Sequence, residues 1–185
     1  MKSKLFAGLA IALFAGFASA ADLKSGPQVG GKIQVPFYPL NINGPTPGEK
    51  KCLVCRNGDN PVAMIFARSM DDKNLIALMK KIDAATADNT DCKMGSFVVF
   101  CTDDDKAEKG LAELVKKEDY KKLVVSVDNP AGPKEYIVAK DADITVVLYT
   151  DRAVKANYAF EKGKMTEKDV EAIVKDVAKI TPTKK

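Results

Sequence analysis

The sequence predicts an α/β domain built on a mixed central sheet with helices on both faces. Short continuous apolar runs are typical of buried strands, segments of helical periodicity separate them, and glycine and proline mark several junctions. Strands that alternate with helices pair in parallel through crossover connections, so the core of the sheet is expected to be parallel. Two last strands that follow each other closely make the sheet mixed.

Five strands are predicted in the second part of the chain. Each is a run of four to eight mostly apolar residues, the length expected of a buried strand. Their ranges are 62–67, 95–100, 123–127, 144–149 and 154–160. The last two are expected to form a hairpin across Thr150-Asp151-Arg152.

Helices are predicted between and after these strands. The first is expected to begin at Ser69 as N-cap, with Asp71 and Asp72 in its first turn, where acidic residues are stabilised by the helix dipole. The second covers 106–117, and a short helical segment covers 134–139. Thr166-Glu167-Lys168-Asp169 resembles a capping box and opens the last helix.

The N-terminus has the pattern of a cleavable signal peptide over residues 1–20. Lys2 and Lys4 precede the apolar run 5–17, and Ala18-Ser19-Ala20 matches the small-residue cleavage site, so cleavage is expected before Ala21. The apolar run is shorter than the roughly 20 residues that span a bilayer. We therefore expect a periplasmic or secreted protein without a membrane span after cleavage.

Two further segments follow in the predicted organisation. Residues 21–60 form a Gly/Pro-rich extension that contains Cys52-Leu53-Val54-Cys55, and residues 61–181 form the core domain. The alternating stretch Lys32 to Tyr38 predicts an edge strand or hairpin arm.

Composition excludes several classes of function. The chain has no histidine, so a histidine-based catalytic triad, a histidine-ligated metal and covalent haem attachment are excluded. The net charge is +4, and basic residues are interleaved with acidic ones, so no nucleic-acid partner is expected. The run Asp103-Asp104-Asp105 lacks the spaced ligands of a calcium loop and is interpreted as a solvated turn.

The order of elements resembles the thioredoxin-like superfamily, whose fold is a three-layer sandwich of helices around a mixed sheet. The additional unit 95–127 makes the chain most similar to the peroxiredoxin and alkyl hydroperoxide reductase branch. The resemblance covers about residues 30–180 and rests on element order and on segments such as Pro61-Val62-Ala63-Met64-Ile65-Phe66-Ala67-Arg68.

The resemblance implies an active-site cysteine directly after the first core strand, where a helix N-terminus lowers a thiol pKa. This position reads Arg68-Ser69-Met70-Asp71-Asp72-Lys73 and has no cysteine. The *cis*-proline position of the family aligns with Ile144-Thr145 and has no proline. The standard active site is therefore expected to be empty.

The four cysteines lie elsewhere, and four hypotheses compete for them. Cys52, Cys55 and Cys92 are expected near the edge where the parallel strands begin, and Cys101 about 20 Å away at the other edge. A structural disulfide could join Cys92 to Cys52 or Cys55. Alternatively, Cys52 and Cys55 form a reversible redox pair, although no helix N-terminus is predicted beside them. The third hypothesis is a zinc site formed by the four cysteines, and the fourth is that the thiols are unpaired or form intermolecular bonds.

The sequence therefore favours an exported protein that performs thiol–disulfide chemistry. The candidate catalytic pair is Cys52 and Cys55, with Cys92 as a resolving or structural partner, and no cofactor or metal is expected. The implied partner is a thiol-containing protein. The alternative is a non-catalytic binding or scaffold protein whose cysteines are purely structural.

Overall fold

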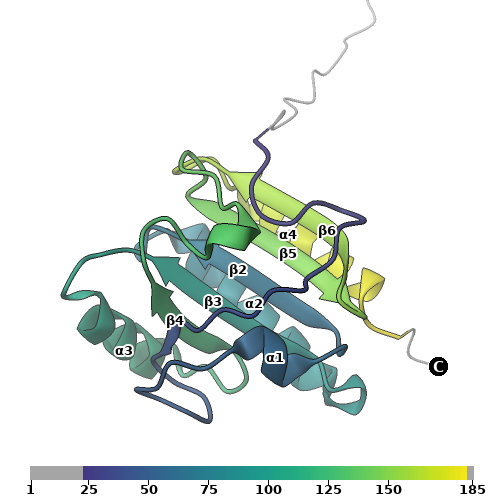
Figure 1. Cartoon of the computed structure of the whole chain (residues 1–185), viewed down its shortest axis with the longest axis horizontal. Coiled ribbons are helices and arrows are strands. Elements are labelled where there is room, and N and C mark those ends of the chain that lie inside the picture. Colours follow the sequence, from purple (N-terminus) through teal and green to yellow (C-terminus); the bar gives the residue numbers. More distant parts are fainter. Residues whose placement is uncertain (1–22, 183–185) are drawn as a thin grey trace, which may run out of the picture.

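The structure is a computed structural model that describes residues 23–182 (Figure 1). The predicted signal peptide and its cleavage site lie outside the described residues. A six-stranded sheet forms the centre, in the order β1-β4-β3-β2-β5-β6. The strands are β1 (Leu40–Asn41), β2 (Val62–Ala67), β3 (Gly95–Cys101), β4 (Val124–Asp128), β5 (Ile144–Thr150) and β6 (Ala153–Phe160).

The sheet is mixed, as the sequence predicts. β2 pairs in parallel with β3, where Val62 lies opposite Gly95, and β3 pairs in parallel with β4. β5 runs antiparallel to β2 and forms a hairpin with β6. The hairpin turns at Asp151 and Arg152, which both have positive φ, and the backbone N–H of Asp151 donates to the carbonyl of Asp59 at 2.8 Å. The five predicted strands are confirmed to within one or two residues at each end.

Three helices cover the first face of the sheet. They are α2 (Lys73–Asp88), α3 (Ala107–Glu118) and α4 (Glu167–Asp176), and Figure 1 shows α2 and α4 behind the strands. Their apolar residues join the alternate strand residues Ala63, Ile65 and Val98 in one buried cluster. Because successive strand side chains point to opposite faces, the other residues of the same strands form a separate cluster.

The predicted start of the first long helix is wrong by three residues. Asp72 is the N-cap of α2, and its side chain accepts hydrogen bonds from the backbone N–H groups of Asn74 and Leu75. Ser69 instead donates its hydroxyl to Asp143 at 2.7 Å. Ser69, which local capping preference favours as the N-cap, is therefore engaged in a tertiary hydrogen bond, and Asp72 caps the helix instead. The capping box of Thr166 and Asp169 at the start of α4 is confirmed.

The second face is covered mainly by chain that is not helical. Residues 23–52 run across this face in Figure 1, together with α1 (Leu53–Asn57) and the short 3₁₀ helix η2 (Lys134–Tyr136). Phe37 inserts its ring among Tyr136, Phe66 and Phe97, with centroid separations of 4.8, 6.1 and 6.4 Å. The extension thus completes a hydrophobic core that the helices leave open.

The predicted edge strand at Lys32 to Tyr38 is not formed. This segment makes a single bridge, between Lys32 and Ala153, and the strand of the extension is β1, two residues farther along the chain. Ile33 and Phe37 are buried in the second cluster, while the residues between them are exposed. The segment therefore packs through two anchors on the face of the sheet instead of pairing along an edge. Among residues 23–182, no helix is long and apolar enough to cross a membrane.

Candidate functional site

The short helix α1 presents the Cys-x-x-Cys pair at the surface. Leu53 and Val54, between the cysteines, are buried in the second cluster and fix the helix to the sheet. Cys55 is exposed and Cys52 is half-buried. The two form a disulfide with a Cα–Cα distance of 5.3 Å, within the usual range. The pair is therefore held by a buried base and faces outward.

A tight contact fixes α1 against the start of β3. A β-carbon at Gly95 would lie 2.0 Å from the side-chain oxygen of Asn57, the last residue of α1, so a larger residue at this position would have to displace the Asn57 side chain. Asn57 also donates its side-chain N–H to the carbonyl of Leu53 at 2.8 Å. This packing places α1, and the disulfide with it, near the edge where the parallel strands β2 and β3 begin; Figure 1 shows α1 at this edge.

Cys52 is the N-cap of α1, which corrects the prediction that no helix begins beside the pair. The backbone N–H of Cys55 donates to the sulfur of Cys52 at 3.0 Å. An N–H group in this position would also stabilise a thiolate on Cys52 after reduction, because it donates to the charged form. Gly58 follows α1 as its C-cap with positive φ, and this glycine is the sequence signal that could have revealed the helix.

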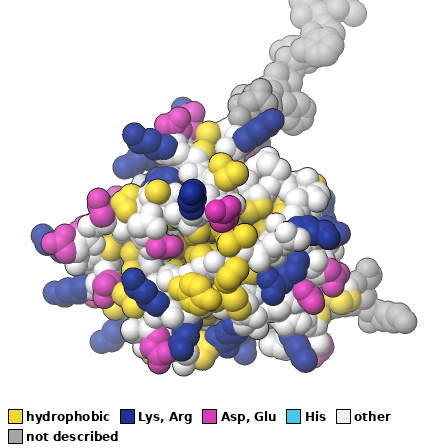
Figure 2. All heavy atoms as spheres, viewed as in Figure 1, with side chains coloured by type: hydrophobic (Ala, Val, Ile, Leu, Met, Phe, Trp, Pro, Cys, Tyr) yellow, Lys and Arg dark blue, Asp and Glu magenta, His cyan; other side chains and the backbone are white. Residues whose placement is uncertain are grey.

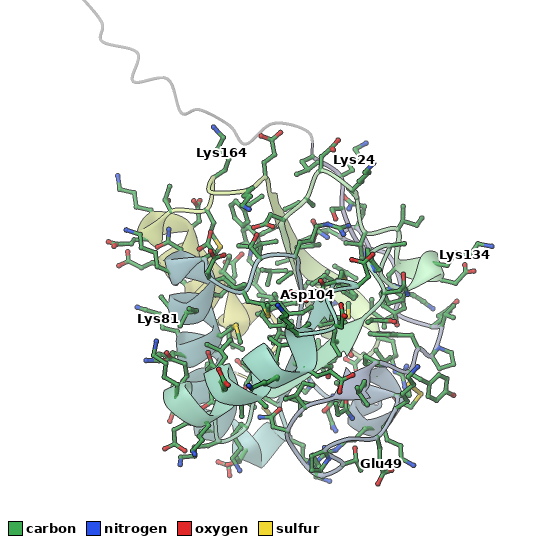
Figure 3. All side chains as sticks on the ribbon, turned by 90° about the vertical axis from the view of Figure 1, so that its left-hand side faces the viewer. Lys24, Glu49, Lys81, Asp104, Lys134 and Lys164 are labelled. Carbon is green, nitrogen blue, oxygen red and sulfur yellow. A yellow bond between two sulfur atoms is a disulfide. The ribbon has the colours of Figure 1, made fainter. Side chains whose placement is uncertain are left out.

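A pocket of about 500 Å³ opens beside the disulfide. Its lining includes Tyr38, Pro45, Lys51 and Arg56 together with both cysteines. Lys51 forms an exposed ion pair with Glu49 at 3.2 Å, whereas Arg56 has no ion-pair partner among the described residues. In Figure 3 the loop that carries Glu49 runs alongside α1. Both cysteines therefore line a pocket whose lining also includes two basic residues.

Hydrophobic side chains are exposed next to this pocket. Tyr38 is 58% exposed and Val35 is 42% exposed, and both belong to the extension. Figure 2 shows a group of hydrophobic side chains near the middle of this face, over the extension and the start of α1.

The other two cysteines do not join the pair. Cys92 packs against the first cluster and Cys52 against the second, so they lie on opposite faces of the sheet. The Cys92 thiol donates to the carbonyl of Asn89 at 3.2 Å. Cys101 is buried at the end of β3, and burial raises the pKa of its thiol to about 12. A disulfide from Cys92 to Cys52 or Cys55 is therefore not formed, and Cys101 is inert as a nucleophile.

A zinc site is not assembled either. Within residues 23–182, no group of three or more cysteine, aspartate or glutamate side chains is placed to hold a metal ion.

The position of the standard thioredoxin site is filled by Arg68, at the opposite end of β2. Its guanidinium group donates to the backbone carbonyls of Ala142 at 2.9 Å, Ala139 at 3.1 Å and Pro130. These carbonyls belong to the loop between β4 and β5, which Arg68 thus ties to the end of β2. The sequence predicts the missing cysteine correctly but not this structural role, because the carbonyls lie more than sixty residues away.

Comparisons with solved structures identify the architecture. A protein from *Bacteroides thetaiotaomicron*, provisionally described as a protein disulfide isomerase, is 13% identical, with a TM-score of 0.62 over 86% of this chain and 94% of its own. A *Chlorobium tepidum* protein, provisionally described as the thiol:disulfide interchange protein DsbE, is 16% identical, with a TM-score of 0.59 over 86% and 99%. The chain has the thioredoxin-like fold. Peroxidoxin BcpB from *Mycobacterium tuberculosis* is similarly related, at 11% identity and a TM-score of 0.58 over 87% and 100%.

These similarities confirm the predicted fold class and include peroxiredoxins, as the element order indicates. Neither the protein-family models nor the curated protein sequences contain a match to this chain.

Proposed function

We propose that the protein is an exported thiol–disulfide exchange protein in which Cys52 and Cys55 are the redox pair. The proposal rests on one observation: the disulfide lies at the surface on α1, and the two residues between its cysteines, Leu53 and Val54, are buried and hold the helix on the sheet. The bond closes a loop between residues only three positions apart, so we expect its removal to change the stability of the fold little. Export is supported by the signal-peptide pattern of residues 1–20.

The different environments of Cys52 and Cys55 support different roles for their sulfur atoms. A thiolate of the partner attacks the exposed sulfur of Cys55, forms a mixed disulfide with it and breaks the bond to Cys52. Cys52 leaves as a thiolate that accepts the backbone N–H of Cys55, and a stabilised thiolate is the better leaving group. A second thiol of the partner then attacks the mixed disulfide and releases Cys55. One disulfide of this protein is thus converted into one disulfide of the partner, with two protons transferred to Cys52 and Cys55.

In this scheme Cys92 is not required. It lies against the other face of the sheet, and its predicted role as a resolving thiol remains a prediction. A non-catalytic binding or scaffold protein is the second candidate. It is favoured by the arginine that fills the standard site and by the burial of Cys101.

A redox titration of the mature protein, read beside thermal melting, distinguishes the two candidates. We expect a midpoint of roughly −120 to −270 mV, the range of known exchange proteins, and a melting temperature of Cys52→Ser within a few degrees of wild type. A midpoint below about −300 mV together with a large loss of stability would assign the bond to a structural role. Incubating Cys52→Ser with a disulfide-bonded peptide should accumulate a mixed disulfide on Cys55.

The export part of the proposal has its own test. The N-terminal residue of the protein recovered from the extracytoplasmic fraction should be Ala21, followed by Asp22-Leu23-Lys24. Recovery of the exported protein with Met1 intact would refute cleavage at this site.

A further inference from the structure

A second pocket adjoins the pocket at the disulfide, and it is lined by several basic residues. It has a volume of about 590 Å³ and shares Pro45, Leu53 and Arg56 with the pocket at the cysteines. Four cationic side chains line it: Arg56, Lys93, Lys121 and Lys122. Among the described residues that line it, none is acidic.

The fold itself concentrates these charges. Arg56 precedes β2, Lys93 precedes β3, and Lys121 and Lys122 precede β4. Because β2, β3 and β4 are parallel neighbours, the residues before them meet at one edge of the sheet. Cations that lie far apart in the sequence are thereby brought around one cavity.

Most of this charge is not neutralised within the protein. Lys121 pairs with Asp119 at 2.6 Å, but Arg56, Lys93 and Lys122 form no ion pair with another described residue. The one other carboxylate held at this turn, Asp83, accepts backbone N–H groups of residues 121–123 at 2.7–3.1 Å and does not line the pocket. An excess of positive charge therefore remains next to the disulfide.

The pocket also offers neutral hydrogen-bond donors. Asn60 and Thr90 line it, and neither side chain has a hydrogen bond to another described residue. The volume is in the range of pockets that hold several side chains or a small ligand. Lysine and arginine with free amide and hydroxyl groups are the combination that binds carboxylates.

We propose that this basic pocket binds acidic side chains of the protein segment whose cysteine exchanges with Cys52–Cys55. The inference rests on the proposed function and specifies its substrate: a thiol protein with acidic residues close to the reacting cysteine. Charge complementarity of this kind mainly increases the rate of association, and salt weakens it.

The test uses two synthetic dithiol peptides that are identical except for a flanking segment. One has three glutamates there and the other has three glutamines. The rate constant for reduction of the oxidised wild-type protein should be about tenfold higher with the acidic peptide at low ionic strength, and nearly equal for the two at 0.5 M salt. In the double variant Lys93→Gln/Lys122→Gln, this preference should fall to about twofold or less.

Lys155→Gln/Lys168→Gln is the matched control. It removes the same charge from exposed positions on β6 and α4, and β6 is the far edge strand of the sheet. This control should keep the full preference for the acidic peptide. Equal loss in both double variants would show that only net charge matters and would overturn the pocket assignment.

The outcomes separate this inference from the proposed function. Equal rates with both peptides would refute the acidic partner and leave disulfide exchange intact. If neither peptide reduced the protein, exchange itself would be refuted, and a cysteine-free acidic peptide would still test the pocket by fluorescence anisotropy. That peptide should bind wild type more tightly than Lys93→Gln/Lys122→Gln. A single-stranded oligonucleotide of equal charge that bound as tightly would overturn the assignment to a peptide.

Discussion

Replacing Phe37 by alanine tests whether the N-terminal extension is part of the core. The Phe37 ring is 7% exposed and contacts three other aromatic rings on the second face of the sheet. Burial of a phenylalanine side chain contributes roughly 1.5–3 kcal/mol of transfer free energy. Phe→Ala changes in cores cost roughly 3–5 kcal/mol once the cavity is included.

We therefore expect Phe37→Ala to lower the free energy of unfolding by about 4 kcal/mol. For a domain of this size, the melting temperature should fall by about 8–16 °C. The measurement is urea unfolding followed by circular dichroism, together with a melting curve. The neighbouring Tyr38→Ala is the control, because Tyr38 is 58% exposed and its loss should change stability by no more than about 0.5 kcal/mol.

A loss below about 1 kcal/mol in Phe37→Ala, with an unchanged urea dependence, would refute this reasoning. It would mean that the extension does not cover the sheet in solution.

Three further predictions concern the end of the sheet opposite the disulfide. Arg68→Met should lower the free energy of unfolding, measured by urea titration, by about 3 kcal/mol, because three loop carbonyls lose a charged donor. The control is Lys140→Met, at an exposed position on the same loop, which should change this free energy little. Burial raises the pKa of Cys101 to about 12 from 9.0, so its stabilising effect is present below pH 9 and is lost as the pH rises toward 12. When the pH is raised from 8 to 11, the free energy of unfolding of wild type should therefore fall by on the order of 2–3 kcal/mol more than that of Cys101→Ala. Buried tyrosines also have a raised pKa, but they are present in both proteins and do not affect the difference. Finally, the fully reduced protein should not consume hydrogen peroxide at peroxiredoxin-like rates in a stopped-flow assay, because no cysteine lies at Arg68–Lys73. Rapid consumption abolished by one Cys→Ser change would show that one of the four thiols is peroxidatic and that the alignment of the standard site with Arg68–Lys73 is wrong.

Periodicity and strand order predicted the sheet well because each strand is buried by its own local sequence. Segments such as Val62–Ala67 are apolar throughout, so their own residues predict a strand that is buried on both faces. The segment Lys32 to Tyr38 was misjudged for the opposite reason. Its alternation suits an edge strand equally well, and only the aromatic cluster on the sheet, contributed by residues up to about a hundred positions away, fixes it as a packing segment.

The candidate site was predicted in composition but not in geometry. The spacing of Cys52 and Cys55 indicates exchange chemistry, yet whether either would pair with Cys92 depends on which face of the sheet each occupies. That choice is made by Leu53 and Val54, which turn the helix toward the second cluster. The basic pocket could not be predicted for a related reason. Arg56, Lys93 and Lys122 are far apart in the sequence and come together only because β2, β3 and β4 lie side by side in parallel.

The extension that closes the second face has a consequence for the order of folding. Its contacts are remote in sequence: Ser25 bonds Thr145 across 120 positions, and Tyr136 donates to the carbonyl of Val35 across 101. The segment synthesised first has no surface to dock on until β5 has been added, and non-local contacts of this kind form slowly. The disulfide, in contrast, closes between residues three positions apart. Cys52 and Cys55 can therefore be oxidised while the sheet is still incomplete, before the extension has docked on it.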